Sequence, residues 1–306
     1  MQAIERYRGS LLGLAVGDAL GEPLEGNLPG WFRPLEDMEG QGLWTDDTSM
    51  ALCLADSLIA CQGFDALDQM RRYLRWLKEG YLSSQDFAFG IGQTVLTALE
   101  RFDETDEPYC GSTHPRTAGN GCIMRLAPVP LAYARRPREA IQYAADSSRT
   151  THATIECLDA CRYFAGLIAG AAQGVSKDEL LSDHYAPVLG IWQEAPLASK
   201  VDEIAGGSFR RKQPPEIRGT GYVVESLEAA LWAFYRSDSF QEGALLAVNL
   251  GHDTDTTGAV YGQLAGAFYG EQAIPEHWRA QVIHHEMIAS FAEQLYLLAE
   301  KLGQAR

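Results

Sequence analysis

The sequence predicts an all-α protein on two observations. Apolar residues recur at three- and four-residue spacing, the repeat of one helix face, through most of the chain. Strand-like alternation over more than four residues is scarce. In chain order, the ten segments with the helical repeat are 48–61, 66–79, 88–101, 123–134, 138–146, 153–173, 222–236, 240–250, 257–269 and 286–302.

Polar segments rich in glycine and proline separate these helices. They cover 22–46, 103–121 and 203–221, and none has the length or monotony of a disordered linker. With 306 residues, 46% of them hydrophobic, the chain can form a sizeable core. We therefore expect one domain over 1–306, with functional residues on its loops.

Glycines recur every fourth residue near both ends of the chain. The ladders are Gly9, Gly13, Gly17 and Gly21, then Gly258, Gly262, Gly266 and Gly270, with a shorter one at Gly166, Gly170 and Gly174. Because glycine costs a helix about 1 kcal/mol relative to alanine, a ladder needs a benefit, which is close helix approach. If the first two ladders pack in antiparallel fashion, Glu25 comes close to Asp253 and Asp255.

Charge, apolar runs and cysteines exclude several classes of protein. A formal charge of −16 argues against nucleic acid as a partner, except as a modified substrate. The apolar stretch near the N-terminus is too short to span a bilayer. The six cysteines show no CxxC pair or disulfide framework, so we expect them reduced and buried in a cytoplasmic protein.

Two predicted helices begin with crowded acidic residues, in "WTDDTS" (44–49) and "HDTDTT" (252–257). One interpretation is two charged N-caps. One aspartate would satisfy that role, however, and adjacent like charges repel unless a cation lies between them. Carboxylate and hydroxyl oxygens select Mg²⁺, Mn²⁺ or Ca²⁺ over zinc, and this set suffices for two octahedral ions completed by water.

Six motifs together closely resemble the ADP-ribosylglycohydrolase family, and within it the bacterial dinitrogenase-reductase-activating branch. They are "GDALGEPLEG" (17–26), "WTDDTSMALCLADSL" (44–58), "GNGCIMRLAPVPLAY" (119–133), "SRTTHAT" (148–154), "GTGYVVESLEAALWAF" (219–234) and "NLGHDTDTTGAVYGQLAGAFYG" (249–270). The resemblance implies a compact, single-domain orthogonal helical bundle. It also implies two Mg²⁺ or Mn²⁺ ions beneath an ADP-ribose cleft.

The resemblance assigns the metal ligands and the catalytic residues. Glu25 would act beside the metals, together with Asp46 and Asp255. The full set of implied ligands is Thr45, Asp46, Asp47, Asp253, Asp255 and Thr256.

The resemblance also assigns residues to the substrate. The loop "RTAGNG" would bind the diphosphate through Thr117, Gly119, Asn120 and Gly121, because backbone N–H groups bind phosphate without lysine. Asn120 as a helix N-cap is an alternative. His152 would contact the ligand or serve as a structural hydrogen-bonder. Tyr222 would stack on the ligand or pack a helix start. His252 departs from the family pattern and would line the cleft or cap its helix.

The implied activity is metal-dependent hydrolysis of the glycosidic bond between ADP-ribose and an acceptor. Arginine-linked protein side chains are the first expectation, although 89–92 lacks an aspartate that arginine-directed relatives carry. Alternatives are O-linked, nucleic-acid-linked or small-molecule conjugates, and a non-catalytic ADP-ribose-binding protein. A metal-dependent phosphohydrolase ranks lower, because it would need further histidine and basic groups.

Overall fold

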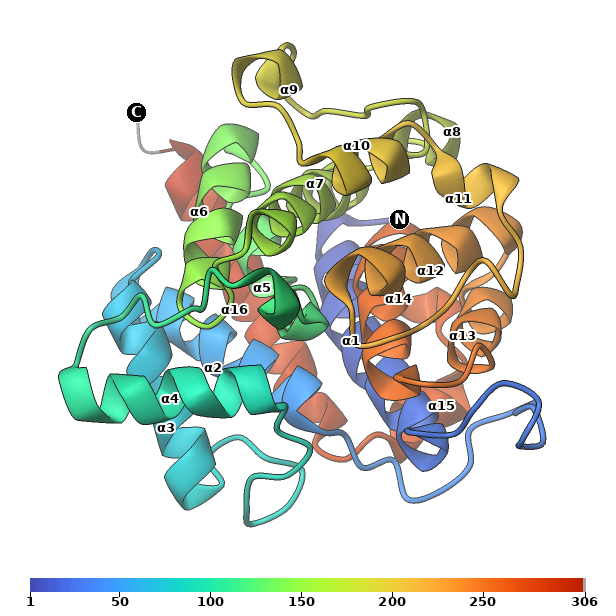
Figure 1. The fold of residues 1–306 in the computed structure, drawn as a ribbon, viewed down its shortest axis with the longest axis horizontal. Coiled ribbons are helices and arrows are strands. Elements are labelled where there is room, and N and C mark those ends of the chain that lie inside the picture. Colours follow the sequence, from blue (N-terminus) through green and yellow to red (C-terminus); the bar gives the residue numbers. More distant parts are fainter. Residues whose placement is uncertain (305–306) are drawn as a thin grey trace.

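The computed structural model describes residues 1–304 and contains helices but no strand within them (Figure 1), which confirms the all-α prediction. The α-helices are α1 (Ala3–Gly21), α2 (Asp46–Cys61), α3 (Ala66–Glu79), α4 (Gln93–Thr105), α5 (Pro128–Ala132), α6 (Pro137–Arg149), α7 (Ile155–Ala172), α8 (Lys177–Leu180), α9 (Ile191–Glu194), α10 (Ser199–Ala205), α11 (Ser208–Arg211), α12 (Val223–Arg236), α13 (Phe240–Val248), α14 (Thr254–Tyr269), α15 (Glu276–Gln281) and α16 (His285–Gln304). Short 3₁₀ turns are η1 (Glu22–Leu24), η2 (Pro115–Thr117), η3 (Asn120–Cys122) and η4 (Glu271–Ala273).

The long helices α1 and α14 lie against each other in antiparallel fashion, as the glycine ladders predict. A Cβ atom added at Gly262 would lie 1.9 Å from the carbonyl oxygen of Gly13, and one at Gly17 would lie 2.0 Å from that of Gly258. Gly9 faces Gly266 in the same way. Only glycine allows this backbone contact, so the ladders fix the register of the two helices.

The third ladder has a different partner from the one expected. Gly166 and Gly170 face Pro187 and the hydroxyl of Tyr185, which belong to the segment after α8 and not to a long helix. Gly174 lies beyond the end of α7 with a φ of +85°, a value that favours glycine. The close approach expected of this ladder is therefore made mainly to that segment and not to the backbone of another helix.

Two predicted helices are shorter than the sequence suggests. The segment 88–101 begins its helix only at Gln93, because Gly90 takes a φ of +80° and interrupts the repeat. The segment 123–134 keeps only α5, which contains Pro128 and Pro130, since proline cannot donate the backbone hydrogen bonds of a longer helix. The short helices α8 to α11 and α15 were not predicted.

The core surrounds the α1–α14 pair. Helices α7, α12, α13 and α16 pack against this pair and cross it in different directions (Figure 1). Within residues 1–304, one connected cluster of buried hydrophobic side chains includes the indoles of Trp44, Trp76 and Trp278. It is consistent with the predicted single domain over 1–306. None of the described helices is long and apolar enough to cross a membrane.

Candidate active site

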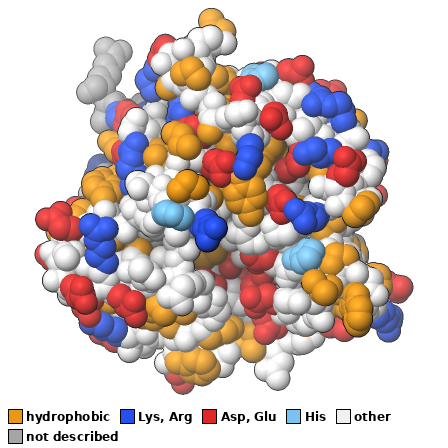
Figure 2. All heavy atoms as spheres, in the orientation of Figure 1, with side chains coloured by type: hydrophobic (Ala, Val, Ile, Leu, Met, Phe, Trp, Pro, Cys, Tyr) orange, Lys and Arg blue, Asp and Glu red, His pale blue; other side chains and the backbone are white. Residues whose placement is uncertain are grey.

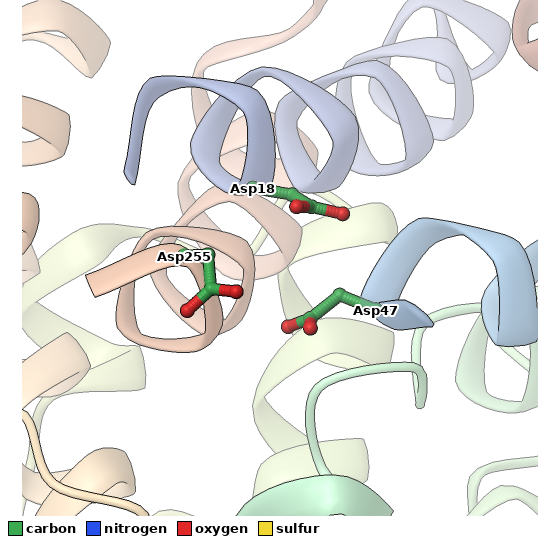
Figure 3. Close-up of side chains that lie close together, drawn as sticks. All are labelled: Asp18, Asp47 and Asp255. Atoms are coloured by element: carbon green, nitrogen blue, oxygen red, sulfur yellow. The ribbon is translucent and has the colours of Figure 1, made fainter. Parts of the chain in front are cut away.

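Three aspartates from three helices meet where α1 ends and where α2 and α14 begin. One carboxylate oxygen from each of Asp18, Asp47 and Asp255 lies within 4.8 Å of the other two, and Figure 3 shows the three side chains around one small space. The antiparallel ladders bring the ends of α1 and α14 together, and all three aspartates are buried. The predicted meeting of the two acidic helix starts is therefore confirmed.

Asp18 is the member of this cluster that the sequence analysis missed. Its carboxylate accepts hydrogen bonds from the N–H and hydroxyl of Thr45, both at 3.0 Å. It also accepts from the N–H of Thr48 at 3.1 Å and from its hydroxyl at 2.6 Å. The free N–H groups at the start of α2 are thus satisfied by a side chain of α1. The signal was a lone aspartate inside the glycine ladder.

The residues at the N-cap positions of the two acidic helix starts do not cap them with their side chains. The N-cap residues are Thr45 for α2 and Asp253 for α14, and neither side chain makes a capping hydrogen bond. Because Asp18 caps α2, the side chains of Asp46 and Asp47 are left for another role. The interpretation of two charged caps is therefore wrong for α2, whereas at α14 Oδ1 of Asp255 accepts from the N–H of Thr256 at 2.8 Å.

The predicted ligands Thr45 and Thr256 both reach Asp47. Their hydroxyls lie 3.2 Å and 3.5 Å from Oδ2 of Asp47. The other oxygen of Asp47, Oδ1, is buried and has no hydrogen-bond partner. An unsatisfied buried carboxylate oxygen is costly, so this atom needs a ligand.

Burial and like charge both disfavour the ionised form of the aspartates in this region. Burial raises the pKa of Asp46, Asp47 and Asp255 well above the usual value, and the neighbouring aspartates raise it further. None of the described residues that line the adjoining cleft is a lysine or arginine. Oxygen ligands, excess negative charge and an orphaned carboxylate atom together fit a hard divalent cation.

A cleft of about 240 Å³ opens above the aspartates, where Figure 2 shows acidic side chains in a hollow. Its walls come from the two acidic helix starts, the glycine loop after η2 and the first turn of α4. The predicted residues that line it are Glu25, Asp46, Gly119, Asn120, Gly121, His152, Asp253, Asp255 and Thr256. Thr45 and Asp47 lie buried beneath this floor.

The glycine loop is tied to the acidic floor through Asn120. Its side-chain amide donates a 2.9 Å hydrogen bond to Oδ2 of Asp253, and its backbone N–H donates to the carbonyl of Gly221 at 3.0 Å. Asn120 is therefore engaged within the protein. It is also not a helix N-cap, because Gly119 holds that position in η3, so that alternative is wrong.

His152 forms the back of the glycine loop. The imidazole is buried, and its Nδ1 lies 2.9 Å from the hydroxyl of Thr151. A Cβ at Gly121 would come within 2.8 Å of the ring, so this loop needs glycine to close over it. Burial lowers the pKa of His152 to about 4, which keeps the ring neutral. The residue both supports the loop and lines the cleft.

The ADP-ribosylglycohydrolase family model matches residues 1–305. The chain belongs to the ADP-ribosylglycohydrolase family. It is 36% identical over 305 residues to the ADP-ribosylarginine hydrolase Tri1 of Serratia proteamaculans, covering 97% of this chain and 81% of that protein. It is 28% identical to the ADP-ribosyl-[dinitrogen reductase] glycohydrolase of Rhodospirillum rubrum, covering 91% and 90%.

A solved structure extends the likeness to three dimensions. An ADP-ribosylglycohydrolase-related protein complex superposes with a TM-score of 0.85 at 43% identity, covering 97% of this chain and 99% of that one. The compact helical bundle expected from the resemblance is therefore confirmed.

Three predicted substrate residues of this ADP-ribosylglycohydrolase lie outside the cleft lining. Thr117 donates its hydroxyl to the carbonyl of His114 at 2.7 Å. Tyr222 is the N-cap residue before α12, and its hydroxyl contacts Glu156 and Lys200, both at 2.7 Å. These three contacts hold both residues beside the cleft.

His252 is the third residue outside the cleft lining. It has a φ of +66°, and its backbone pairs with Gly26 and Asn27. His252 lines a second cavity, which is separate from the cleft.

The structure adds one loop that the sequence analysis placed in a helix. Gly90 approaches the first turn of α2 so closely that a Cβ there would lie 2.9 Å from Oδ1 of Asp46. Gly92, Gln93, Thr94 and Val95 continue this wall of the cleft. The glycines at 90 and 92 were the available signal.

Proposed function

We propose that this ADP-ribosylglycohydrolase hydrolyses the glycosidic bond between ADP-ribose and an acceptor, with arginine-linked side chains as the first substrate class. The observation that carries the proposal is the buried acidic floor with the orphaned Oδ1 of Asp47, facing a glycine loop across one cleft. Two relatives named ADP-ribosylarginine hydrolase, at 36% and 37% identity, support arginine as the acceptor. Proteins and small-molecule conjugates carrying ADP-ribose are the expected partners.

The cofactor in this proposal is a pair of Mg²⁺ or Mn²⁺ ions. When bound, the ions would supply Lewis-acid chemistry and balance the charge of the floor. The residues that would hold them are Thr45, Asp46, Asp47, Asp253, Asp255 and Thr256. Asp18 has a supporting part, because the hydrogen bonds that it accepts from Thr45 and Thr48 fix the start of α2.

Glu25 is the proposed proton carrier. It lines the cleft, and partial burial with the charges of Asp253 and Glu22 raises its pKa above the usual value. Hydrolysis breaks the bond from the ribose anomeric carbon to the acceptor nitrogen and forms a bond to a water oxygen. The water loses one proton and the leaving nitrogen gains one. A carboxylate with a raised pKa suits both transfers.

The glycine loop is the proposed site of the diphosphate. Gly119 and Gly121 face the cleft without side chains, so a phosphate can approach the backbone directly. Its N–H groups offer hydrogen bonds where the lining has no lysine or arginine. The neutral ring of His152 supports this loop from behind without adding charge.

A release assay tests this function. The intact protein is given arginine-linked, serine-linked and nucleic-acid-linked ADP-ribose with Mg²⁺, with Mn²⁺ and with EDTA, and free ADP-ribose, AMP and phosphate are quantified. We expect metal-dependent release of ADP-ribose, fastest from arginine, and its loss in Asp46→Ala but not in Asp183→Ala, which removes an exposed acid. Release of phosphate or AMP would favour a phosphohydrolase, and binding without turnover a non-catalytic protein.

A cytoplasmic location is also part of the proposal. The six cysteines are unpaired thiols, and five of them are buried, as is common in a reducing compartment. Measuring the protein in cytosolic and secreted fractions of the source cells tests this location.

A further inference from the structure

A second cavity lies beside the cleft and is larger, at about 800 Å³. Its walls are mainly apolar, whereas the cleft is mainly acidic. The apolar residues that matter here are Pro29, Ile217, Trp232, Leu245, Leu246 and Leu250. Arg218 and Glu242 add one charge of each sign. The predicted chemistry of the family site uses none of these residues.

The two cavities share one wall. Three chain segments each supply one residue to the cleft and a near neighbour to the apolar cavity. These pairs, with the cleft residue first, are Glu25 and Pro29, Gly221 and Arg218, and Asp253 and His252. A molecule that reaches over this wall therefore contacts both cavities.

Backbone hydrogen bonds hold the shared wall together. The N–H of His252 donates to the carbonyl of Asn27, and the N–H of Gly26 donates to the carbonyl of His252, both at 2.7 Å. The backbone N–H of Asp253 donates to the carbonyl of Gly219 at 2.9 Å. Hydrogen-bonded backbone segments lie about 5 Å apart, so a wall of two or three segments is thin enough for an extended peptide to cross.

The loop that supplies Pro29 to the apolar cavity also exposes two apolar side chains. Trp31 is 82% exposed and Leu28 is 53% exposed, on either side of Pro29. Figure 2 shows hydrophobic side chains gathered beside the acidic hollow. The buried indole N–H of Trp232 in the cavity wall also has no hydrogen-bond partner. Contiguous exposed apolar area is typical of a surface that contacts another molecule.

We propose that this cavity, with Leu28 and Trp31, binds an aliphatic or aromatic side chain of the acceptor polypeptide, a few residues from the modified residue held in the cleft. The inference rests on the proposed function. A polypeptide is the occupant because the acceptor chain must leave the cleft, and residues about two to four positions away lie roughly 7–14 Å along an extended chain. The apolar walls suit such a side chain and do not suit the polar ADP-ribose.

The test compares substrates that do and do not reach the cavity. The substrates are free ADP-ribosyl-arginine, an ADP-ribosyl-arginine peptide flanked by glycines and the same peptide flanked by leucines. The variant is Leu246→Arg, since Leu246 is only partly buried and lies on α13. The matched control is Leu297→Arg, which alters a 64% exposed leucine of α16.

We expect wild type and Leu297→Arg to show a kcat/KM about tenfold higher for the leucine-flanked peptide than for the glycine-flanked one, as burial of one leucine predicts. In Leu246→Arg this ratio of kcat/KM values should fall to near one. The kcat/KM for the leucine-flanked peptide should fall much more than that for free ADP-ribosyl-arginine. Equal rates on both peptides in wild type, or a preference retained in Leu246→Arg, would overturn the inference.

Two further measurements distinguish peptide binding in the cavity from a failure of the proposed activity and from self-association. If wild type hydrolyses no arginine conjugate, the proposed function fails. Fluorescence anisotropy then still tests the cavity, by comparing the affinities of the unmodified leucine-flanked and glycine-flanked peptides for wild type, Leu246→Arg and Leu297→Arg. Sedimentation of wild type and Leu246→Arg tests a second copy of the chain as the occupant. A dimer that only Leu246→Arg dissociates would also overturn the inference.

Discussion

The hydroxyl and the backbone N–H of Thr48 both donate to Oδ2 of Asp18, at 2.6 Å and 3.1 Å, and so tie the first turn of α2 to α1. A helix start is usually capped by a residue of its own chain segment. Here the cap comes from a neighbouring helix. The consequence is that Asp46 keeps its carboxylate for the cleft and Asp47 keeps its carboxylate for the acidic cluster beneath it.

Replacing Asp18 tests whether it caps α2 and so leaves Asp46 and Asp47 to bind metal. Asp18→Ala should lower the free energy of unfolding in excess Mg²⁺ by about 1–3 kcal/mol, because buried N–H groups at the start of α2 lose their acceptor. It should also weaken metal binding, because the start of α2 carries Asp46 and Asp47. Chemical denaturation and metal titration by calorimetry measure the two effects.

Asp65→Ala is the matched control for that experiment. Asp65 caps α3 by accepting from the N–H groups of Leu67 and Asp68, at an exposed site. Its removal should cost about 1 kcal/mol and leave metal affinity unchanged. If Asp18→Ala binds metal as tightly as Asp65→Ala does, the positioning role of Asp18 is wrong.

Metal binding should stabilise the protein, and more so at higher pH. Burial and the neighbouring carboxylates raise the pKa of Asp46, Asp47 and Asp255 in the folded state, so ionising them costs stability as pH rises from the usual aspartate value to the raised one. A bound cation removes this cost. At 100 times its dissociation constant, Mg²⁺ or Mn²⁺ should add about 2.7 kcal/mol. The shift in melting temperature on adding metal should therefore be larger at pH 8 than at pH 5.5.

Adding metal should reverse the order of the melting temperatures of Asp47→Asn and wild type. In EDTA at pH 8 the variant should melt at or above the wild-type temperature, because one repelling charge is gone. With metal in excess the wild type should melt higher, because the variant loses a ligand. A variant that remains less stable than wild type in EDTA would contradict a dominant role for charge repulsion.

The glycine register gives a prediction about stability alone. Gly262→Ala places a Cβ 1.9 Å from the backbone oxygen of Gly13 and should cost about 2 kcal/mol or more. Gly92→Ala is the control, because no atom lies within 4 Å of its added Cβ and its φ is −73°. It should cost less than about 1 kcal/mol. Equal losses in the two variants would show that close helix approach is not what the ladder provides.

The sequence could predict the parts of this structure that follow from repetition. Glycines at four-residue spacing predicted the α1–α14 register, and the doubled aspartates predicted the acidic floor. The role of Asp18 was not predicted, because nothing in the local sequence distinguishes a residue that caps another helix from an ordinary polar residue. His252 was expected at the cleft or as a cap, but its left-handed backbone pairs with the 26–27 segment and takes it into the second cavity.

The segment 88–92 and the short helices could not be predicted for a related reason. Phe89 and Ile91 continue the apolar repeat of α4, yet Gly90 turns the chain toward Asp46. Tertiary contact overrides the local pattern there. Helices such as α8 and α9 are too short to show a repeat at all.

Glu25→Gln should separate catalysis from binding. The amide keeps the size of the side chain but cannot carry the proton, so kcat should fall by about 10²- to 10⁴-fold while metal and ADP-ribose affinities change little. In the wild type the acidic limb of the pH profile should lie above the usual glutamate value, because the pKa of Glu25 is raised. A variant with normal kcat would assign proton transfer to another group.

His152 predicts how acid destabilises the fold. Burial lowers its pKa from 6.5 to about 4. Between these two pH values the unfolded chain therefore binds a proton that the folded protein does not bind. Stability from this residue is fully present above about pH 6.5 and is lost as pH falls toward 4, by roughly 3 kcal/mol in all. His152→Gln removes the titrating group. In EDTA, its stability relative to wild type should therefore improve steadily from pH 7 to pH 5. A constant difference between His152→Gln and wild type over this range would mean that His152 is not held neutral by burial.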